Sequence, residues 1–370
     1  MFQILKLLRE LGHRVTFVPD NLANISPYTG ELQKRGIKVL YHPYLGKVRD
    51  YLISYGSEFD AVILTRCHFA RKHIADVRLY APRSRIIFDT VDLHFIREAG
   101  EAQVTGDSET KRQAQETERL EYQLIDEADE TWVVSRSEQR LLQEKRPGKS
   151  IQVVSNIVDV PGSKTPFALR RDWLFIGSFQ HTPNVDAVLF FVQKIYPLVR
   201  PRLPDAKFYI IGDKAPPEIV SLADDNIVIT GLQKDAQPFF DSIKLSVAPL
   251  RFGAGVKGKI NQSMGLGVPV VATSIAVEGA ELKKGEDILV EDDPEAFANA
   301  LIALYESEDL WNRLSENGLR KTRALYSAET ARKKLEVLFS DEHIRGSENA
   351  PRLRNKGFPQ SLQAGRDFQL

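Results

Sequence analysis

The stretch LSVAPLRFGAGVKGKINQSMGLGVPVVATS, residues 245–274, decides the fold of this chain. It begins as an uninterrupted apolar run of strand length, passes through a glycine-rich basic loop, continues as a short helix and returns to a second apolar strand. Strands that are apolar on both faces are covered by helices on both sides, so the pattern predicts a parallel sheet wound with crossover helices.

The same alternation runs through most of the chain and predicts two such sheets in succession. Between them, residues 158–171 contain two prolines and a glycine without an apolar period, which is typical of a linker. We therefore expect an N-terminal domain over 1–160, a linker over 161–171 and a second domain over 172–340. The predicted strands are 14–18, 38–41, 61–65, 85–88, 131–135 and 151–154, then 173–176, 208–211, 227–229, 245–248, 268–272 and 288–290.

The two ends of the chain depart from this alternation. Residues 2–11 predict an amphipathic helix where a doubly wound domain normally opens on a strand, so we expect a shortened N-terminal domain that lacks its first strand. The charged stretch 106–129 predicts an exposed helix, and 328–339 predicts a last helix that packs back on the N-terminal domain. Residues 341–370 have no apolar period and are expected to be disordered.

Composition excludes several classes of protein. Fifty basic and fifty acidic side chains cancel, so no global field attracts nucleic acid. Cys67 is the only cysteine, which excludes a disulfide framework and indicates a cytoplasmic location. No apolar run is long enough to span a bilayer, which leaves peripheral contact with the inner face of the cell membrane as an open alternative.

The glycine-rich loop has the chemistry of a diphosphate site. Glycines let backbone N–H groups approach a phosphate, the following helix adds its N-terminal dipole, and Lys257 and Lys259 add positive charge. Two known phosphate-binding motifs match this loop only in part. A dinucleotide site needs an acidic residue where Thr273 and Ser274 end the next strand, and a P-loop needs Ser or Thr where Ile260 stands. A diphosphate site without a metal or other cofactor remains.

At these residues the chain resembles the retaining GT-B glycosyltransferases of family 4. The resemblance rests on WLFIGSFQHTPN (173–184), FYIIGD (208–213), VITGLQKD (228–235) and APLRFGAGVKGKINQSMGLGVPVVAT (248–273), and in the first domain on RELGHRVTFVPDN (9–21), FDAVILTR (59–66), FDTVDLHFIRE (88–98) and SNIVD (155–159). It implies an α/β fold of two doubly wound, Rossmann-like domains facing a cleft, with the donor on the second domain and the acceptor on the first.

The resemblance also implies roles for particular residues. Arg251 and Lys257 would stabilise charge on the leaving diphosphate, and the donor would be bound by Gly177, Ser178, Gly253, Gly255, Lys259 and Gln262. The chain departs from the family where two glutamates are replaced by Ala254 and Gln262, and where the usual basic residues after Ser178 are missing. Gln262 would then hydrogen-bond a ribose hydroxyl as a neutral partner.

Polar side chains also follow one strand of the first domain and the first strand of the second. Asp89, Asp92 and His94 lie at the carboxyl end of the predicted strand 85–88, where they would orient or deprotonate an acceptor hydroxyl. The alternative is that Asp89 caps a turn and His94 packs beside it. For His181 and Asn184 we favour capping of a helix that starts at Val185 over donor contact.

The sequence therefore predicts a hexosyltransferase that moves a sugar from a UDP- or GDP-sugar to a glycan, lipid-linked or small-molecule acceptor, with retention of configuration, as in polysaccharide biosynthesis. Two alternatives remain open. One is a UDP-sugar epimerase of the same fold, and the other is an inactive relative that only binds nucleotide-sugar, favoured by Ala254 and Gln262.

Overall fold

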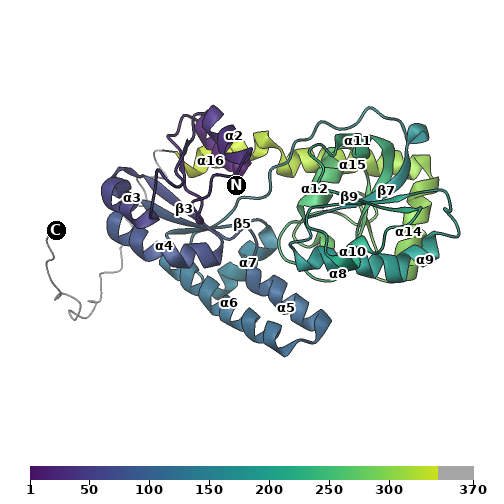
Figure 1. Ribbon diagram of the computed structural model, residues 1–370, viewed down its shortest axis with the longest axis horizontal. Helices are drawn as coiled ribbons and strands as arrows, with labels where there is room; N and C mark the ends of the chain where they lie inside the picture. The colour runs from purple at the N-terminus through teal and green to yellow at the C-terminus, as the bar shows by residue number, and fades with distance from the viewer. Residues whose placement is uncertain (341–370) are drawn as a thin grey trace.

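The computed structural model describes residues 1–340, which form two α/β lobes side by side (Figure 1). The expectation of disorder for 341–370 lies outside the described residues. The N-terminal lobe contains the first predicted strand series and the C-terminal lobe the second, joined by an extended segment after Val153.

The C-terminal lobe is one six-stranded parallel sheet in the order β12-β11-β10-β7-β8-β9. Its central strands are almost wholly buried because helices cover both faces, which explains the uninterrupted apolar runs of the sequence. The strands are β7 (Arg171–Ile176), β8 (Phe208–Ile211), β9 (Ile227–Gly231), β10 (Ile243–Ala248), β11 (Val270–Ala272) and β12 (Leu289–Val290).

The helices of this lobe connect the strands in the expected crossover manner. They are α8 (Thr182–Phe190), which continues through a π-helical turn (Phe191–Ile195) into α9 (Tyr196–Val199), then α10 (Pro217–Val220), α11 (Gln237–Ser242), α12 (Gly258–Gly265), α13 (Ser274–Val277), α14 (Pro294–Glu306) and α15 (Glu308–Tyr326). A 3₁₀ turn, Phe167–Leu169, precedes β7.

The sheet of the N-terminal lobe is divided in two. A four-stranded parallel sheet has the order β3-β4-β5-β6, and β1 pairs with β2 in a separate two-stranded sheet. The sequence predicted a single doubly wound sheet, whereas among residues 1–340 no strand joins β1 to β3. The strands are β1 (Thr16–Phe17), β2 (Lys38–Val39), β3 (Ala61–Thr65), β4 (Arg85–Asp89), β5 (Glu130–Val133) and β6 (Ile151–Val153).

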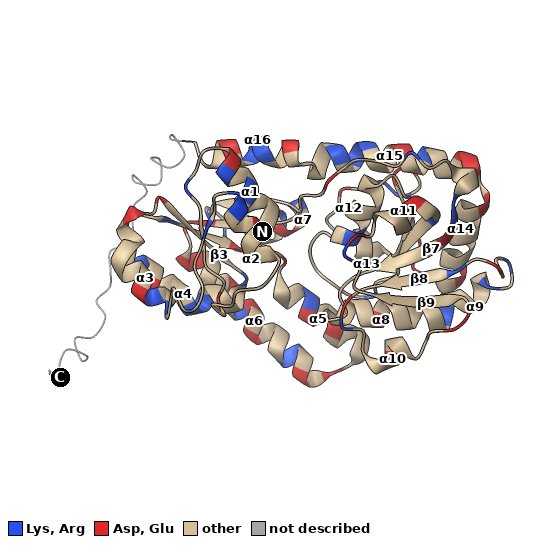
Figure 2. Ribbon diagram, turned by 45° about the horizontal axis from the view of Figure 1, so that its top comes forward, with Lys and Arg blue, Asp and Glu red and all other residues tan. Residues whose placement is uncertain are grey.

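Helices of both chain ends complete the N-terminal lobe. Ile4, Leu7 and Leu8 of α1 pack with Leu335 and Leu338 of α16 in one apolar cluster that also includes Ile87 and Trp132 of the sheet. The last helix therefore crosses back from the C-terminal lobe, as Figures 1 and 2 both show. The helices are α1 (Phe2–Glu10), α2 (Tyr28–Lys34), α3 (Val48–Tyr55) followed by a 3₁₀ turn (Gly56–Glu58), α4 (Cys67–Tyr80), α5 (His94–Thr105), α6 (Ser108–Glu127), α7 (Arg136–Lys145) and α16 (Ala328–Leu338).

The charged stretch after the fourth strand forms an antiparallel helix pair, α5 and α6, that extends from the N-terminal lobe (Figure 1). Gly106 ends α5 in the left-handed conformation, and the Asp107 carboxylate accepts hydrogen bonds from the N–H groups of Glu109 and Thr110 to begin α6. Acidic and basic side chains are interspersed over α6, α15 and α16 (Figure 2). Among residues 1–340, no helix combines the length and the apolar character that crossing a membrane requires.

Candidate functional site

The glycine-rich loop between β10 and α12 touches the N-terminal lobe. A Cβ placed on Gly255 would lie 3.1 Å from Cγ2 of Val134 and 3.2 Å from Cβ of Asp92, and Gly255 has a φ of 66°. Gly253 has a φ of 150°, and a Cβ there would lie 3.2 Å from the Lys257 side chain. The backbone conformation at Gly255 thus favours glycine, and any larger side chain there would crowd Val134 and Asp92 of the other lobe.

Lys257 at the end of this loop is buried, Lys259 in the first turn of α12 is half-buried, and both donate hydrogen bonds to neutral groups. Lys257 is 8% exposed and donates to the carbonyl of Gly255 at 2.7 Å, while Lys259 donates to Oδ1 of Asn184 and lies 4.0 Å from the centroid of the Phe175 ring. Burial, with the neighbouring Lys257 charge, lowers the pKa of Lys259 to about 7. Burial also lowers the pKa of Lys257, against the charges of Glu278, Glu138 and Asp92. Both ammonium groups would be stabilised by an anion.

The loop after β7 and the start of α8 lie against Lys259. A Cβ on Gly177 would lie 2.8 Å from the side-chain nitrogen of Asn184, so only glycine leaves room for that amide. Asn184 donates to the carbonyl of Ser178 at 2.6 Å and accepts from Lys259. The expectation that Asn184 caps a helix starting at Val185 is wrong: α8 begins at Thr182, and neither Asn184 nor His181 caps it through its side chain. Instead, Asn184 fixes the position of the lysine.

Arg251, predicted to be catalytic, and Gln262, predicted to bind the donor, have different surroundings. Arg251 donates to both oxygens of Asp186 on α8 and lies 5.3 Å from the centroid of the Phe190 ring, so its charge already has a counterion. The hydrogen bond with Asp186 raises the pKa of Arg251 further. Gln262 lies on α12 and is half-buried, and within the described residues its amide group has no hydrogen-bond partner.

On the N-terminal lobe, His94 is held in a buried network of opposite charges. Its Nδ1 lies 3.1 Å from the Asp92 carbonyl oxygen, 3.4 Å from a carboxylate oxygen of Asp92 and 3.5 Å from Oε1 of Glu121. Burial lowers the pKa of His94, but the hydrogen bond with Glu121 and the Asp92 charge outweigh it and the net pKa is raised. Asp92 also forms an ion pair with Arg97. An imidazole that retains its proton is a poor base, so the packing interpretation of His94 fits this geometry better than deprotonation of an acceptor.

Asp89, the third predicted acceptor-side residue, is buried, and burial raises its pKa. Its carboxylate accepts a hydrogen bond from the Val91 N–H at 3.4 Å, which agrees with the turn-capping interpretation.

Near His94, one ligand atom each of Cys67, His94 and Glu121 lie within 4.8 Å of one another, a spacing that a metal ion can bridge. The donor set does not fit a metal. Burial raises the pKa of the Cys67 thiol to about 12, and the Glu121 carboxylate already accepts the N–H groups of His94 and Phe95. Glu121 therefore acts as the N-terminal cap of α5.

The sequence did not identify two charged residues that lie where the lobes meet. Glu138 of α7 is buried beside the loop, and burial raises its pKa to about 7, while its carboxylate accepts hydrogen bonds from the N–H groups of Val134 and Leu93. Arg66 follows β3 directly, and its positive charge contributes to lowering the pKa of His181 on the other lobe. A basic residue directly after a buried strand is the signal that could have identified Arg66.

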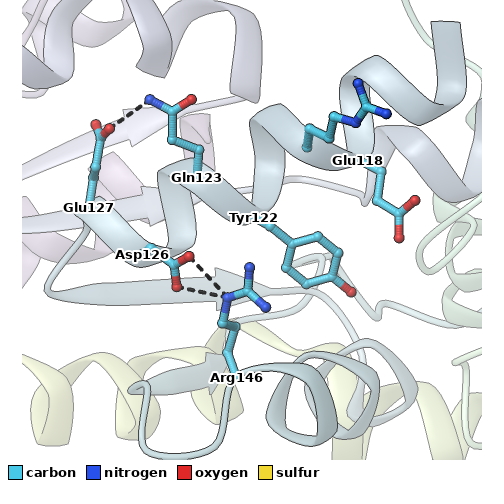
Figure 3. A pocket seen from close by; sticks show the side chains of 7 residues that line it. Glu118, Tyr122, Gln123, Asp126, Glu127 and Arg146 are labelled. Atoms are coloured by element: carbon cyan, nitrogen blue, oxygen red, sulfur yellow. Dashed lines mark hydrogen bonds and ion pairs between the residues drawn. The ribbon is translucent and has the colours of Figure 1, made fainter.

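A separate hollow of about 510 Å³ lies on the N-terminal lobe (Figure 3). It is lined by α6 and by Arg146, whose guanidinium lies 4.6 Å from the centroid of the Tyr122 ring and donates to Asp126 at 2.8 Å. None of the predicted site residues lines it, so we do not assign it a ligand.

Comparison of the sequence with known protein families gives a match in the C-terminal lobe. Residues 170–307 match the family model described as "Glycosyl transferases group 1". A stretch of 138 residues, 35% of this chain, is 28% identical to an "Uncharacterized 44.6 kDa protein in cps region" of Klebsiella pneumoniae, and it spans about a third (36%) of that relative. The family match thus lies in the lobe that carries the lysines.

The similar solved structures extend over both lobes. The Anabaena protein HepE, solved with UDP and glucose, has a TM-score of 0.67 at 12% identity and covers 92% of this chain and 95% of its own. The fold is GT-B. Sucrose-phosphate synthase of Thermosynechococcus elongatus has a TM-score of 0.66 at 14% identity, with 91% of both chains covered, and TarM has 0.64 at 15%, with 80% of this chain and 59% of TarM covered. The predicted two-domain, Rossmann-like architecture is confirmed.

Proposed function

We propose that this protein transfers a hexose from a nucleoside-diphosphate sugar to a glycan, lipid-linked or small-molecule acceptor, with retention of configuration. The observation that carries the proposal is the pair of lysines, buried Lys257 and half-buried Lys259, whose hydrogen-bond partners are neutral. The match of residues 170–307 to a glycosyltransferase family model supports it, as does the complex of HepE with UDP and glucose.

In this proposal the donor diphosphate lies against the glycine-rich loop. Lys259, fixed by Asn184, and Lys257 neutralise negative charge that grows on the diphosphate as the glycosidic bond breaks. Because these groups are already in place, they stabilise the transition state more than the bound donor. We include in the proposal that the lysines replace a metal, that Gln262 bonds a ribose hydroxyl and that the protein acts in the cytoplasm.

The test is product analysis with UDP-, GDP- and ADP-hexoses in the presence of EDTA and mixed acceptors. The proposal predicts release of one nucleoside diphosphate together with a new glycoside whose anomeric configuration, read from proton coupling constants, equals that of the donor. Release of a free, epimerised monosaccharide would show an epimerase instead. Binding of nucleotide without any turnover would show an inactive relative.

A further inference from the structure

Arg66 differs from the other cations where the two lobes meet. Lys257 and Lys259 donate to neutral oxygens, and Arg251 and Arg97 form ion pairs with Asp186 and Asp92. The Arg66 guanidinium has neither a hydrogen bond nor an ion pair among residues 1–340. Its positive charge is therefore available to a ligand.

The position of Arg66 puts this charge on the acceptor side of the site. It follows β3 and precedes α4, and its backbone N–H donates to the carbonyl of Asp89 at 2.8 Å. Burial lowers the pKa of His181 at the start of α8, and the charges of Arg66 and Arg97 lower it further. Arg66 thus belongs to the N-terminal lobe but acts on the first loop of the donor lobe.

The backbone at Arg66 is strained. Its φ of 66° and ψ of 142° lie in a region that glycine adopts readily and that a residue with a Cβ adopts at a cost. Such strain persists where the surrounding structure enforces it, and it concentrates at functional sites. A glycine here would relieve the strain, so the presence of arginine indicates a use for its side chain.

We propose that Arg66 binds an anionic group, a phosphate or a carboxylate, carried by the acceptor. This inference rests on the proposed function, in which the donor diphosphate occupies the lysines of the other lobe. A guanidinium presents two parallel N–H donors that match the paired oxygens of either anion. Acceptors that carry such a group are therefore preferred over neutral ones.

The first test measures anion binding with the donor site filled. The protein is saturated with the nucleoside diphosphate that stabilises it most, and its thermal stability is followed during titration with inorganic phosphate or glycerate at constant ionic strength. We expect a saturable further stabilisation by at least one anion, which also tells phosphate from carboxylate recognition. No saturable response in the unmodified protein would overturn the proposal.

The decisive variant is Arg66→Gly, because glycine suits the backbone and folding should be preserved or improved. We expect it to bind the nucleoside diphosphate within twofold of the unmodified protein while losing the anion response. Arg66→Lys should retain part of that response, and the exposed Arg71→Gln of α4 is the matched control. A response that survives in Arg66→Gly, or loss of nucleoside diphosphate binding in it, would overturn the assignment to the acceptor.

A transfer assay then separates this inference from the proposed function. Matched acceptors are compared: glycerol with glycerol 3-phosphate and glycerate, and glucose with glucose 6-phosphate and glucuronate. We expect a preference of at least tenfold in kcat/KM for an anionic member, which Arg66→Gly abolishes. Transfer with no such preference would overturn the inference alone. Anion binding without any sugar transfer would overturn the proposed function and the assignment to an acceptor together.

Discussion

The two lysines at the glycine-rich loop and the histidine network of the N-terminal lobe both hold charged groups away from full exposure to solvent, yet their charges are balanced differently. Lys257 and Lys259 hydrogen-bond to a carbonyl and an amide, and neither forms an ion pair among residues 1–340, although the more distant charges of Glu278, Glu138 and Asp92 act on Lys257. His94 lies between the carboxylates of Asp92 and Glu121. Uncompensated buried charge destabilises the free protein and is relieved by a ligand, whereas a balanced network stabilises the fold without one.

The largest effect is expected for the lysine with the most strongly shifted pKa. Lys259→Met keeps the length of the side chain and removes the charge, so kcat/KM for the donor should fall by about 10² to 10³, as for loss of one preorganised donor at a developing anion. The comparison variant is Lys283→Met, whose side chain is 70% exposed and which should retain nearly full activity. A loss of less than tenfold in Lys259→Met would show that the loop is not the donor site.

Removing His94 from its network with Asp92 and Glu121 should lower the stability of the fold. His94→Leu leaves the Glu121 carboxylate buried without its counterion, and the free energy of unfolding should fall by about 3 to 5 kcal/mol in urea denaturation. His68→Leu, at the neighbouring exposed histidine, should change it little. If His94→Leu unfolded like the unmodified protein but lost turnover, His94 would be a catalytic residue and the contrast between the two regions would be wrong.

The lowered pKa of Lys259 predicts a pH dependence of donor binding. Above about pH 7 the free lysine loses its proton, and binding of a diphosphate must restore it, so affinity should fall by up to tenfold for each pH unit between 7.5 and 9. Calorimetric titration across this range measures the slope, which should disappear in Lys259→Met. A flat profile in the unmodified protein would place the titrating group elsewhere.

The lowered pKa of Lys259 has the opposite effect on the stability of the ligand-free protein: as pH rises, donor affinity falls but stability increases. In the unfolded chain the lysine keeps its ordinary pKa of 10.5, so between pH 7 and 10.5 the unfolded state binds more protons than the folded one. The contribution of Lys259 should therefore raise stability as pH increases through this window. In thermal denaturation over this range, the unmodified protein should gain stability relative to Lys259→Met.

The smallest effect is expected for Arg251. Because Asp186 already neutralises it and 43% of its side chain is exposed, Arg251→Ala should lower donor kcat/KM by only about threefold. The sequence assigned it a catalytic role equal to that of Lys257, so steady-state kinetics of the two alanine variants compares them directly. An equal loss in both would restore that role.

The sequence predicted the parts of the site that lie on one continuous segment. The strands, the glycine-rich loop and the helix after it follow from apolar periodicity and from glycine, and the structure contains them at 243–272. Interactions between distant segments could not be predicted in this way. Asn184 and Lys259 are 75 positions apart, and their hydrogen bond depends on how close β7 and β10 bring their loops.

Two further features depend on tertiary context. The N-terminal sheet is divided because β1 and β3 are not placed side by side. The sequences of both strands are ordinary, so neither shows this division. The strained conformation of Arg66 is enforced by its hydrogen bond to the backbone of Asp89 and by the buried Cys67 that follows it. Local propensity favours neither arrangement, so sequence patterns do not show them.

The most direct test of the central claim is a thermal-shift panel with UDP, GDP, ADP, NAD and ATP. It compares the unmodified protein, a Lys257→Ala, Lys259→Ala double variant and a matched Lys283→Ala, Lys284→Ala double variant. We predict that one nucleoside diphosphate stabilises the first and third proteins by about 2.7 kcal/mol at a hundred times its Kd, and that the loop variant does not respond. An undiminished response in the folded loop variant would contradict the account.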